Sequence, residues 1–204
     1  MELLLIRHAL PLRVENLDGT PADPELSELG HRQAAALAEW LADEPVDAIY
    51  TSPMRRAAQT AAPLAASRGL EAVVEEGVAE FDRHADAYVP IEELKSTDDP
   101  RWKAMVEGDY TFGQDVPVDP VAFARTVVAS IEGIVEANPG RTVAIVAHGG
   151  IINAWAGHVL GTDRFMFFEP GYTSISRFVA ARTGQRQLRS LNEVAHLRGL
   201  TAPA

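Results

Sequence analysis

The amino-acid sequence predicts an α/β fold with a mainly parallel sheet. Short, continuous apolar runs, which are typical of strands buried on both faces, alternate along the chain with longer segments of helical periodicity. With 204 residues, of which 47% are apolar and 23% charged, the chain also has the size and composition of an ordinary globular domain. We therefore expect a single domain over residues 1–204.

The expected strands are short apolar runs bounded by turn residues. The run at the N-terminus, "ELLLI", and the run "TVAIVA" are apolar along almost their whole length, as is expected of central strands. We expect strands at residues 2–6, 46–51, 70–75, 142–147, 173–180 and, with a weaker pattern, 186–191.

Three helices are expected between these strands. The Ala-rich segment 26–42 carries its large apolar residues at helical spacings. The second helix is expected to be capped by Ser52 and to have Pro53 in its first turn, and Pro63 is expected to end or kink it. The third occupies 119–140 and stops at Asn-Pro-Gly.

The stretch 81–118 differs from the rest of the chain. It is acidic, rich in turn residues and carries scattered aromatic residues, which we expect to pack the segment onto the domain, Tyr88 among them. We interpret it as an inserted, cap-like segment with short helices rather than as a second domain.

Composition excludes several classes of protein. The net charge of −11 argues against a nucleic-acid partner, because binding to the phosphate backbone needs clustered Lys and Arg. The absence of cysteine removes disulfides and thiolate chemistry and is compatible with the cytoplasm, the location that we expect. The apolar run at residues 2–6 is too short for a signal peptide, and no stretch approaches the roughly 20 apolar residues of a membrane span. We therefore expect no membrane partner.

Three of the expected buried strands end in reactive residues. The first runs into Arg7 and His8, the second leads to Arg55 and Arg56, and another ends at His148. Ligands of open α/β sheets bind outside the carboxyl ends of the strands. If these strands are parallel neighbours, two histidines and at least two arginines meet at one edge of the sheet.

Such a set of side chains suits a phosphoryl group. Guanidinium groups bind phosphate oxygens through paired hydrogen bonds and keep their charge at any working pH. A neutral imidazole can attack phosphorus and form a covalent intermediate. Gly149 and Gly150, at the start of the next helix, allow close approach of the backbone and offer free N–H groups to an anion. A carboxyl with a raised pKa would protonate the leaving oxygen.

Four segments resemble the motifs of a known family, the histidine phosphatase superfamily, which includes phosphoglycerate mutases and many phosphatases. "LLLIRHA" is similar to its Arg-His-Gly strand, "LSELGHRQAAALAEWL" to its first helix, "TSPMRRAAQTA" to its S-P-x-x-R-A-x-Q-T-A segment and "VAIVAHGGII" to its second histidine motif. The matches are collinear over about residues 2–160. The resemblance implies a phosphoglycerate mutase-like fold, that is, a three-layer αβα sandwich.

The resemblance also implies roles for individual residues. His8 would be the nucleophile that becomes phosphohistidine. Arg7 and Arg56 would hold the phosphoryl oxygens, and Arg56 is preferred to Arg55 because it directly precedes the Ala of R-A-x-Q-T. His148 would complete the phosphate pocket and stabilise the transition state.

The acid and two substrate contacts follow from the same family order. Glu80 would protonate the leaving group, with Asp82 as its rival, and Gly149 and Asn16 would contact substrate. The sequence departs from the family pattern in two places. Ala9 replaces the usual glycine after the histidine, a change that some members share. Asn16 lies two residues late for the asparagine of the mutases, which argues against a mutase.

We therefore expect a metal-independent phosphomonoesterase, a hydrolase that acts on a small phosphorylated metabolite through a phosphohistidine on His8. No cofactor and no metal are expected, because Arg7 and Arg56 would repel a divalent cation. A phosphoglycerate-type mutase and a phosphoprotein phosphatase remain alternatives. A non-enzymatic phosphate-binding scaffold is the weakest, since it would be expected to lose one of these residues. Homodimer formation is left open.

Overall fold

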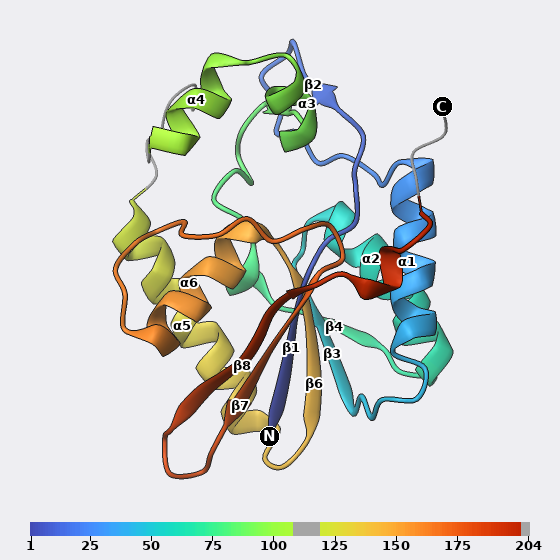
Figure 1. Cartoon of the computed structure of the whole chain (residues 1–204), viewed down its shortest axis with the longest axis vertical. Helices are drawn as coiled ribbons and strands as arrows, with labels where there is room; N and C mark the ends of the chain where they lie inside the picture. Colours follow the sequence, from blue (N-terminus) through green and yellow to red (C-terminus); the bar gives the residue numbers. More distant parts are fainter. Residues whose placement is uncertain (108–118, 201–204) are drawn as a thin grey trace.

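The computed structural model describes residues 1–107 and 119–200, and in this part of the chain a six-stranded sheet lies between two layers of helices (Figure 1). The strand order is β4-β3-β6-β1-β7-β8. The strands are β1 (Glu2–Arg7), β3 (Ala48–Thr51), β4 (Ala72–Val74), β6 (Thr142–Ala147), β7 (Ile175–Ala180) and β8 (Arg186–Glu193). Each falls on a segment that the sequence predicts to be a strand.

The sheet is parallel on one side and antiparallel at the opposite edge. β4, β3, β6 and β1 run in the same direction, whereas β7 pairs antiparallel with β1 and β8 antiparallel with β7. Arg7 is in register with Ala147, and the His8 N–H donates to the Ala147 carbonyl over 2.9 Å. The carboxyl ends of β1 and β6 therefore bring His8 and His148 to neighbouring positions.

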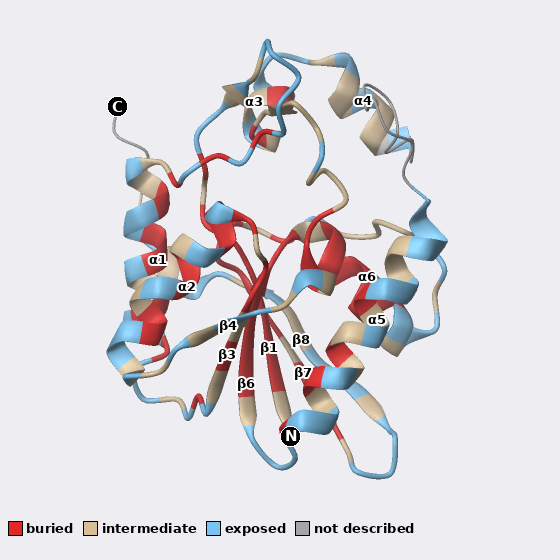
Figure 2. Ribbon diagram, turned by 180° about the vertical axis from the view of Figure 1, so that it is seen from behind, coloured by how far each residue is buried: buried red, intermediate tan, exposed pale blue. Residues whose placement is uncertain are grey.

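Helices cover both faces of the sheet, as a three-layer αβα sandwich requires. α1 (Glu28–Trp40) and α2 (Arg55–Arg68) pack on one face, and α5 (Pro120–Ala137) and α6 (Gly149–Leu160) on the other (Figure 1). Figure 2 shows that the inner strands β1, β3, β6 and β7 and the inward sides of these helices hold the buried residues, whereas the edge strands β4 and β8 are more exposed. Two apolar cores result, one between the sheet and each helical layer.

Helix α2 begins two residues later than predicted and does not end at Pro63. Its N-cap is Met54, and Asp23 Oδ1 accepts the first helical N–H, from Arg55, over 2.9 Å. Pro63 does not end the helix, which continues to Arg68. Burial of Ala61 and Leu64 in the core offsets the hydrogen bond that proline cannot donate.

The cap-like segment lies over the carboxyl edge of the sheet (Figure 1). Its described part, residues 81–107, contains β5 (Ala87–Tyr88), α3 (Ile91–Ser96) and α4 (Pro100–Glu107), and β5 pairs with β2 (Val14–Glu15). Residues 108–118 of the predicted insertion lie outside the described residues. Two 3-10 turns, η1 (Glu76–Val78) and η2 (Ala195–Leu197), complete the elements. None of the described helices has the length and apolar character needed to cross a membrane.

Candidate active site

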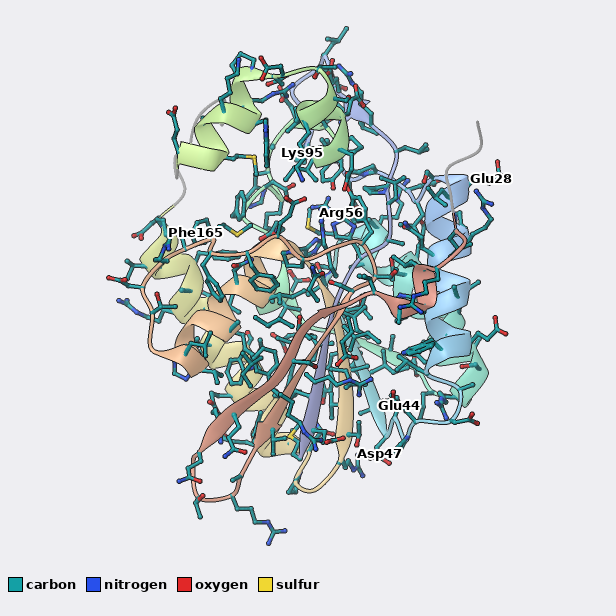
Figure 3. The ribbon with its side chains drawn as sticks, viewed as in Figure 1. Glu28, Glu44, Asp47, Arg56, Lys95 and Phe165 are labelled. Atoms are coloured by element: carbon teal, nitrogen blue, oxygen red, sulfur yellow. The ribbon has the colours of Figure 1, made fainter. Side chains whose placement is uncertain are left out.

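The predicted strand ends do converge at one edge of the sheet. Arg7 is the last residue of β1 and His8 follows it, Arg56 lies in the first turn of α2 after β3, and His148 follows β6. All four are buried, and the His8 and His148 ring centroids are 5.1 Å apart. Figure 3 shows Arg56 between the strand ends and the cap-like segment.

His8 is held as a neutral imidazole. Its Nδ1 lies 2.8 Å from the Ala9 carbonyl oxygen. A carbonyl only accepts hydrogen bonds, so Nδ1 carries the proton and Nε2 keeps its lone pair. Burial, together with the charges of Arg56 and Arg7, lowers the pKa of His8 well below its ordinary value. This is the tautomer and charge state that a nucleophilic imidazole needs.

The Ala9 peptide links His8 to helix α2. Its N–H donates to Thr60 Oγ1 over 2.9 Å, and the Thr60 hydroxyl donates to the Arg56 carbonyl over 2.7 Å. The Ala9 methyl is fully buried beside Leu26 and Ala34. The fold therefore has an apolar place for the methyl that distinguishes Ala9 from the family's usual glycine.

His148 packs against His8 at the base of the site. Its Nε2 lies 2.8 Å from Ser52 Oγ, and its Nδ1 is buried with no hydrogen-bond partner among the described residues. Burial lowers the pKa of His148 well below its ordinary value, and Arg56, His8 and Arg7 lower it further. Both histidines are therefore uncharged at neutral pH.

The two arginines carry N–H groups that the described part of the chain does not satisfy. Arg7 donates from Nη1 to the Pro170 carbonyl over 2.6 Å and stacks 4.1 Å from the Tyr172 ring centroid, but its Nε has no partner. Arg56 donates from Nη2 to Asp82, at 2.9 and 3.2 Å, while its Nε and Nη1 have none. Buried polar groups are nearly always hydrogen-bonded, so these donors indicate a binding site for an anion.

Glu80 is a buried carboxyl at the same site. Its Oε2 accepts the Gly150 N–H over 2.8 Å, and its Oε1 accepts the Phe81 N–H over 3.2 Å. Burial, reinforced by the charge of Asp82, raises the pKa of Glu80 to about 7. The expectation of free N–H groups at the start of α6 is therefore wrong at Gly150, because Glu80 already occupies that N–H.

Asp82, the predicted rival of Glu80, has a different environment. Both of its oxygens contact Arg56 Nη2, so this carboxyl is engaged by the arginine. Its neighbour in sequence order, Glu80, makes no such ion pair within the described residues.

A cavity of about 190 Å³ opens above these residues. Arg7, His8, Arg56, Glu80 and Gly149 line it, and the cap-like segment contributes its upper wall. Asn16 is not brought to this cavity. Its amide donates to the carbonyls of Thr20 and Pro21 in its own loop, over 3.0 and 3.2 Å.

Sequence reasoning missed three residues that shape the site. The ring centroid of Tyr88 lies 4.6 Å from the guanidinium carbon of Arg56, and Tyr88 also lines the cavity. Tyr172 stacks on Arg7. No local pattern marks either tyrosine as a partner of an arginine far away in sequence. Thr60 could have been identified from the sequence, since it is the threonine of the R-A-x-Q-T segment.

Such a sandwich, with a neutral histidine and unsatisfied arginines at its carboxyl edge, is the arrangement expected of an enzyme that acts on phosphoryl groups. Residues 3–194 match the model of the histidine phosphatase superfamily (branch 1). The chain belongs to this family. It is a phosphatase, a hydrolase of phosphate monoesters.

Several known proteins are similar to this chain. Phosphoserine phosphatase 1 from Hydrogenobacter thermophilus is 28% identical over 97% of this chain and 94% of its own. Glucosyl-3-phosphoglycerate phosphatase from Mycobacterium tuberculosis is 34% identical over 68% of this chain and 65% of its own. The structure of phosphoserine phosphatase from Entamoeba histolytica in complex with 3-phosphoglyceric acid has a TM-score of 0.74 and 26% identity, and covers 96% of this chain and 98% of its own.

Proposed function

We propose that this phosphatase hydrolyses a small phosphorylated metabolite through a phosphohistidine formed on His8. The observation that carries the proposal is the pair of buried arginines with unsatisfied N–H groups on either side of a neutral His8. Arg7 and Arg56 would bind the non-bridging oxygens of the phosphoryl group and offset the charge that develops on them.

The reaction needs two steps in this site. First, His8 Nε2 attacks phosphorus in line and the bond to the ester oxygen breaks, while Glu80 gives its proton to the leaving alcohol. Second, the Glu80 carboxylate takes a proton from water, whose oxygen attacks the phosphohistidine and releases phosphate and His8. A carboxyl with a pKa of about 7 suits both duties near neutral pH. His148, packed against His8, would stabilise the transition state in both steps.

The small substrate is supported by the size of the cavity and by the cap-like segment above it. The relatives named above are phosphatases of small phosphorylated molecules by name. A phosphoprotein would need an open groove, which makes this alternative less favoured. A mutase remains the minor alternative, since a 26% identical relative from Yersinia pestis is named a probable phosphoglycerate mutase.

The test is release of phosphate from a generic aryl phosphate, with EDTA present, by wild type and by His8→Ala. We expect wild-type activity to survive EDTA and the variant to be inactive. Equal rates in the two proteins, or activity abolished by EDTA, would contradict the proposal. Three predictions stay as the sequence made them: a single domain over residues 1–204, a cytoplasmic location and substrate contact by Asn16. Homodimer formation stays open.

A further inference from the structure

We infer that the cavity selects phosphate monoesters whose alcohol is small, presents apolar surface and carries no carboxylate. The inference rests on the proposed function, because it concerns the leaving group of the reaction at His8. The relatives named above act, by name, on esters of charged or sugar-bearing alcohols. The upper wall of this cavity favours a different alcohol.

The floor of the cavity, around the site for the phosphoryl group, is charged. Above the floor, the wall carries apolar as well as charged residues. Its apolar residues on the cap-like segment include Val89, Ile91, Leu94 and Met105, and its charged residues are Asp86, Arg101 and Glu169. An alcohol that leaves water for this wall gains from its apolar surface, whereas a carboxylate there would lose its hydration beside two carboxylates of the protein.

The cations of the cap-like segment already have carboxylate partners. Residues 81–118 contain four lysines and arginines, and all four are described. The four ion pairs are Arg83–Glu76 at 3.1 Å, Lys95–Glu169 at 2.6 Å, Arg101–Asp99 at 2.9 Å and Lys103–Asp98 at 2.7 Å. A substrate carboxylate would therefore have to compete with a carboxylate of the protein for each of these cations.

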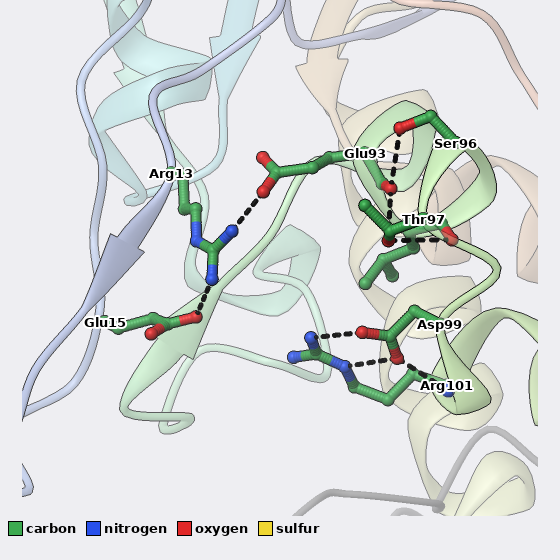
Figure 4. Close-up of polar contacts among 8 residues, drawn as sticks. Arg13, Glu15, Glu93, Ser96, Thr97, Asp99 and Arg101 are labelled. Atoms are coloured by element: carbon green, nitrogen blue, oxygen red, sulfur yellow. Dashed lines mark hydrogen bonds and ion pairs between the residues drawn. The ribbon is translucent and has the colours of Figure 1, made fainter.

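Arg101 is the one of these four cations that lines the cavity. Its Nε and Nη2 each donate to one oxygen of Asp99 over 2.9 Å, which holds the guanidinium in a paired arrangement (Figure 4). Arg13, on the neighbouring loop, lies between Glu15 and Glu93 in the same view. The rim of the cavity is therefore charged but internally neutralised.

Two carboxylates of the wall act against an anionic alcohol. Glu169, which holds Lys95, and Asp86 both line the cavity. A substrate carboxylate would meet the like charge of Asp86 and would have to displace Glu169 to reach Lys95. The cavity, at about 190 Å³, has room for a phosphoryl group and an alcohol of a few carbons.

The experiment compares kcat/KM for four phosphate esters of primary alcohols, so that leaving-group strength differs little. Isobutyl phosphate is the apolar probe, phosphoserine and 3-phosphoglycerate carry a carboxylate, and phosphoethanolamine carries only an ammonium group. We expect kcat/KM for isobutyl phosphate to exceed that for phosphoserine and 3-phosphoglycerate by about tenfold or more, the discrimination that an apolar pocket gives for one or two methylene groups. Phosphoethanolamine, which lacks the carboxylate, should be hydrolysed faster than these two esters.

Two variants identify the wall as the cause. Met105→Gln keeps the size of the side chain and should lower kcat/KM for isobutyl phosphate about tenfold. Inhibition by inorganic phosphate, which reports the floor of the site, should stay the same. Met105→Leu, the matched control, should keep the preference for the apolar ester. Arg101→Met should not lower kcat/KM for phosphoserine more than for isobutyl phosphate.

The inference is overturned if phosphoserine or 3-phosphoglycerate matches or exceeds isobutyl phosphate, or if phosphoethanolamine is no faster than these two esters. It is also overturned if Met105→Gln slows all four esters equally, or if Arg101→Met selectively removes activity on phosphoserine. Failure of the proposed function has a different signature. In that case no ester is hydrolysed, or His8→Ala hydrolyses them as fast as wild type does.

Discussion

Replacing Glu80 by glutamine tests whether this carboxyl holds the proton of the reaction. Burial raises the pKa of Glu80 from an ordinary value of 4.5 to about 7, so the folded protein keeps a proton that the unfolded chain loses between these values. Stability should therefore fall as pH rises through this window. The loss from this one group is roughly 2.5 kcal/mol between pH 5 and pH 8. Glutamine does not titrate, so Glu80→Gln should not show this loss. The unfolding free energy of the variant relative to wild type should therefore rise by about the same amount between pH 5 and pH 8.

Two assays check this prediction. Urea unfolding at pH 5 and pH 8, followed by the fluorescence of the three tryptophans, gives the free energies. Phosphate release should show that kcat/KM on an alkyl phosphate falls about 10²–10⁴-fold in the variant but much less on an aryl phosphate, which needs little protonation. In wild type, kcat/KM on the alkyl ester should decline above about pH 7. If the unfolding free energies of wild type and Glu80→Gln change by the same amount between pH 5 and pH 8, Glu80 does not hold a buried proton. Equal slowing of both esters would make Asp82 or another group the acid.

Three other substitutions probe how the site is built, each checked by urea unfolding and by phosphate release. Arg7→Met should lower kcat/KM at least about 100-fold, because it removes donors to the phosphoryl oxygens, and should lower the unfolding free energy by about 1–3 kcal/mol, because it leaves the buried Pro170 carbonyl unpaired; an unchanged kcat/KM would contradict this. Thr60→Val should cost about 1–3 kcal/mol by leaving the Ala9 N–H unpaired, and Thr60→Ser should restore both stability and rate. Gly30→Ala should cost about 1–3 kcal/mol, because a Cβ there would lie 2.1 Å from the Leu10 carbonyl oxygen; wild-type stability would show that the loop after His8 yields freely.

The framework of the site could be predicted because it depends on local pattern. Buried strands of a parallel sheet appear in the sequence as short apolar runs, and the residues at their carboxyl ends meet at one edge of the sheet. Arg7, His8 and His148 were found in this way. Arg56 needed the resemblance to the family in addition, since Arg55 stands beside it with the same chemistry.

The remainder depends on contacts between distant segments, which no local pattern encodes. Glu80 accepts the Gly150 N–H of α6 across 70 positions of sequence, and this contact corrects the expectation of a free N–H at that position. Asn16 follows β2, its amide donates to carbonyls of its own loop, and the structure does not bring it to the cavity. Pro63 was expected to end or kink α2, and the helix does not end there, because packing against the sheet carries it to Arg68.

The covalent intermediate is the central claim, and trapping it is the most direct test. Wild-type enzyme mixed with a ³²P-labelled phosphomonoester and quenched within milliseconds in alkali should carry label on His8, located by peptide mass spectrometry. The label should be lost on acid treatment, as is expected of a phosphoramidate, and should be absent from His8→Ala. Turnover without labelled protein, or label on another residue, would contradict the account.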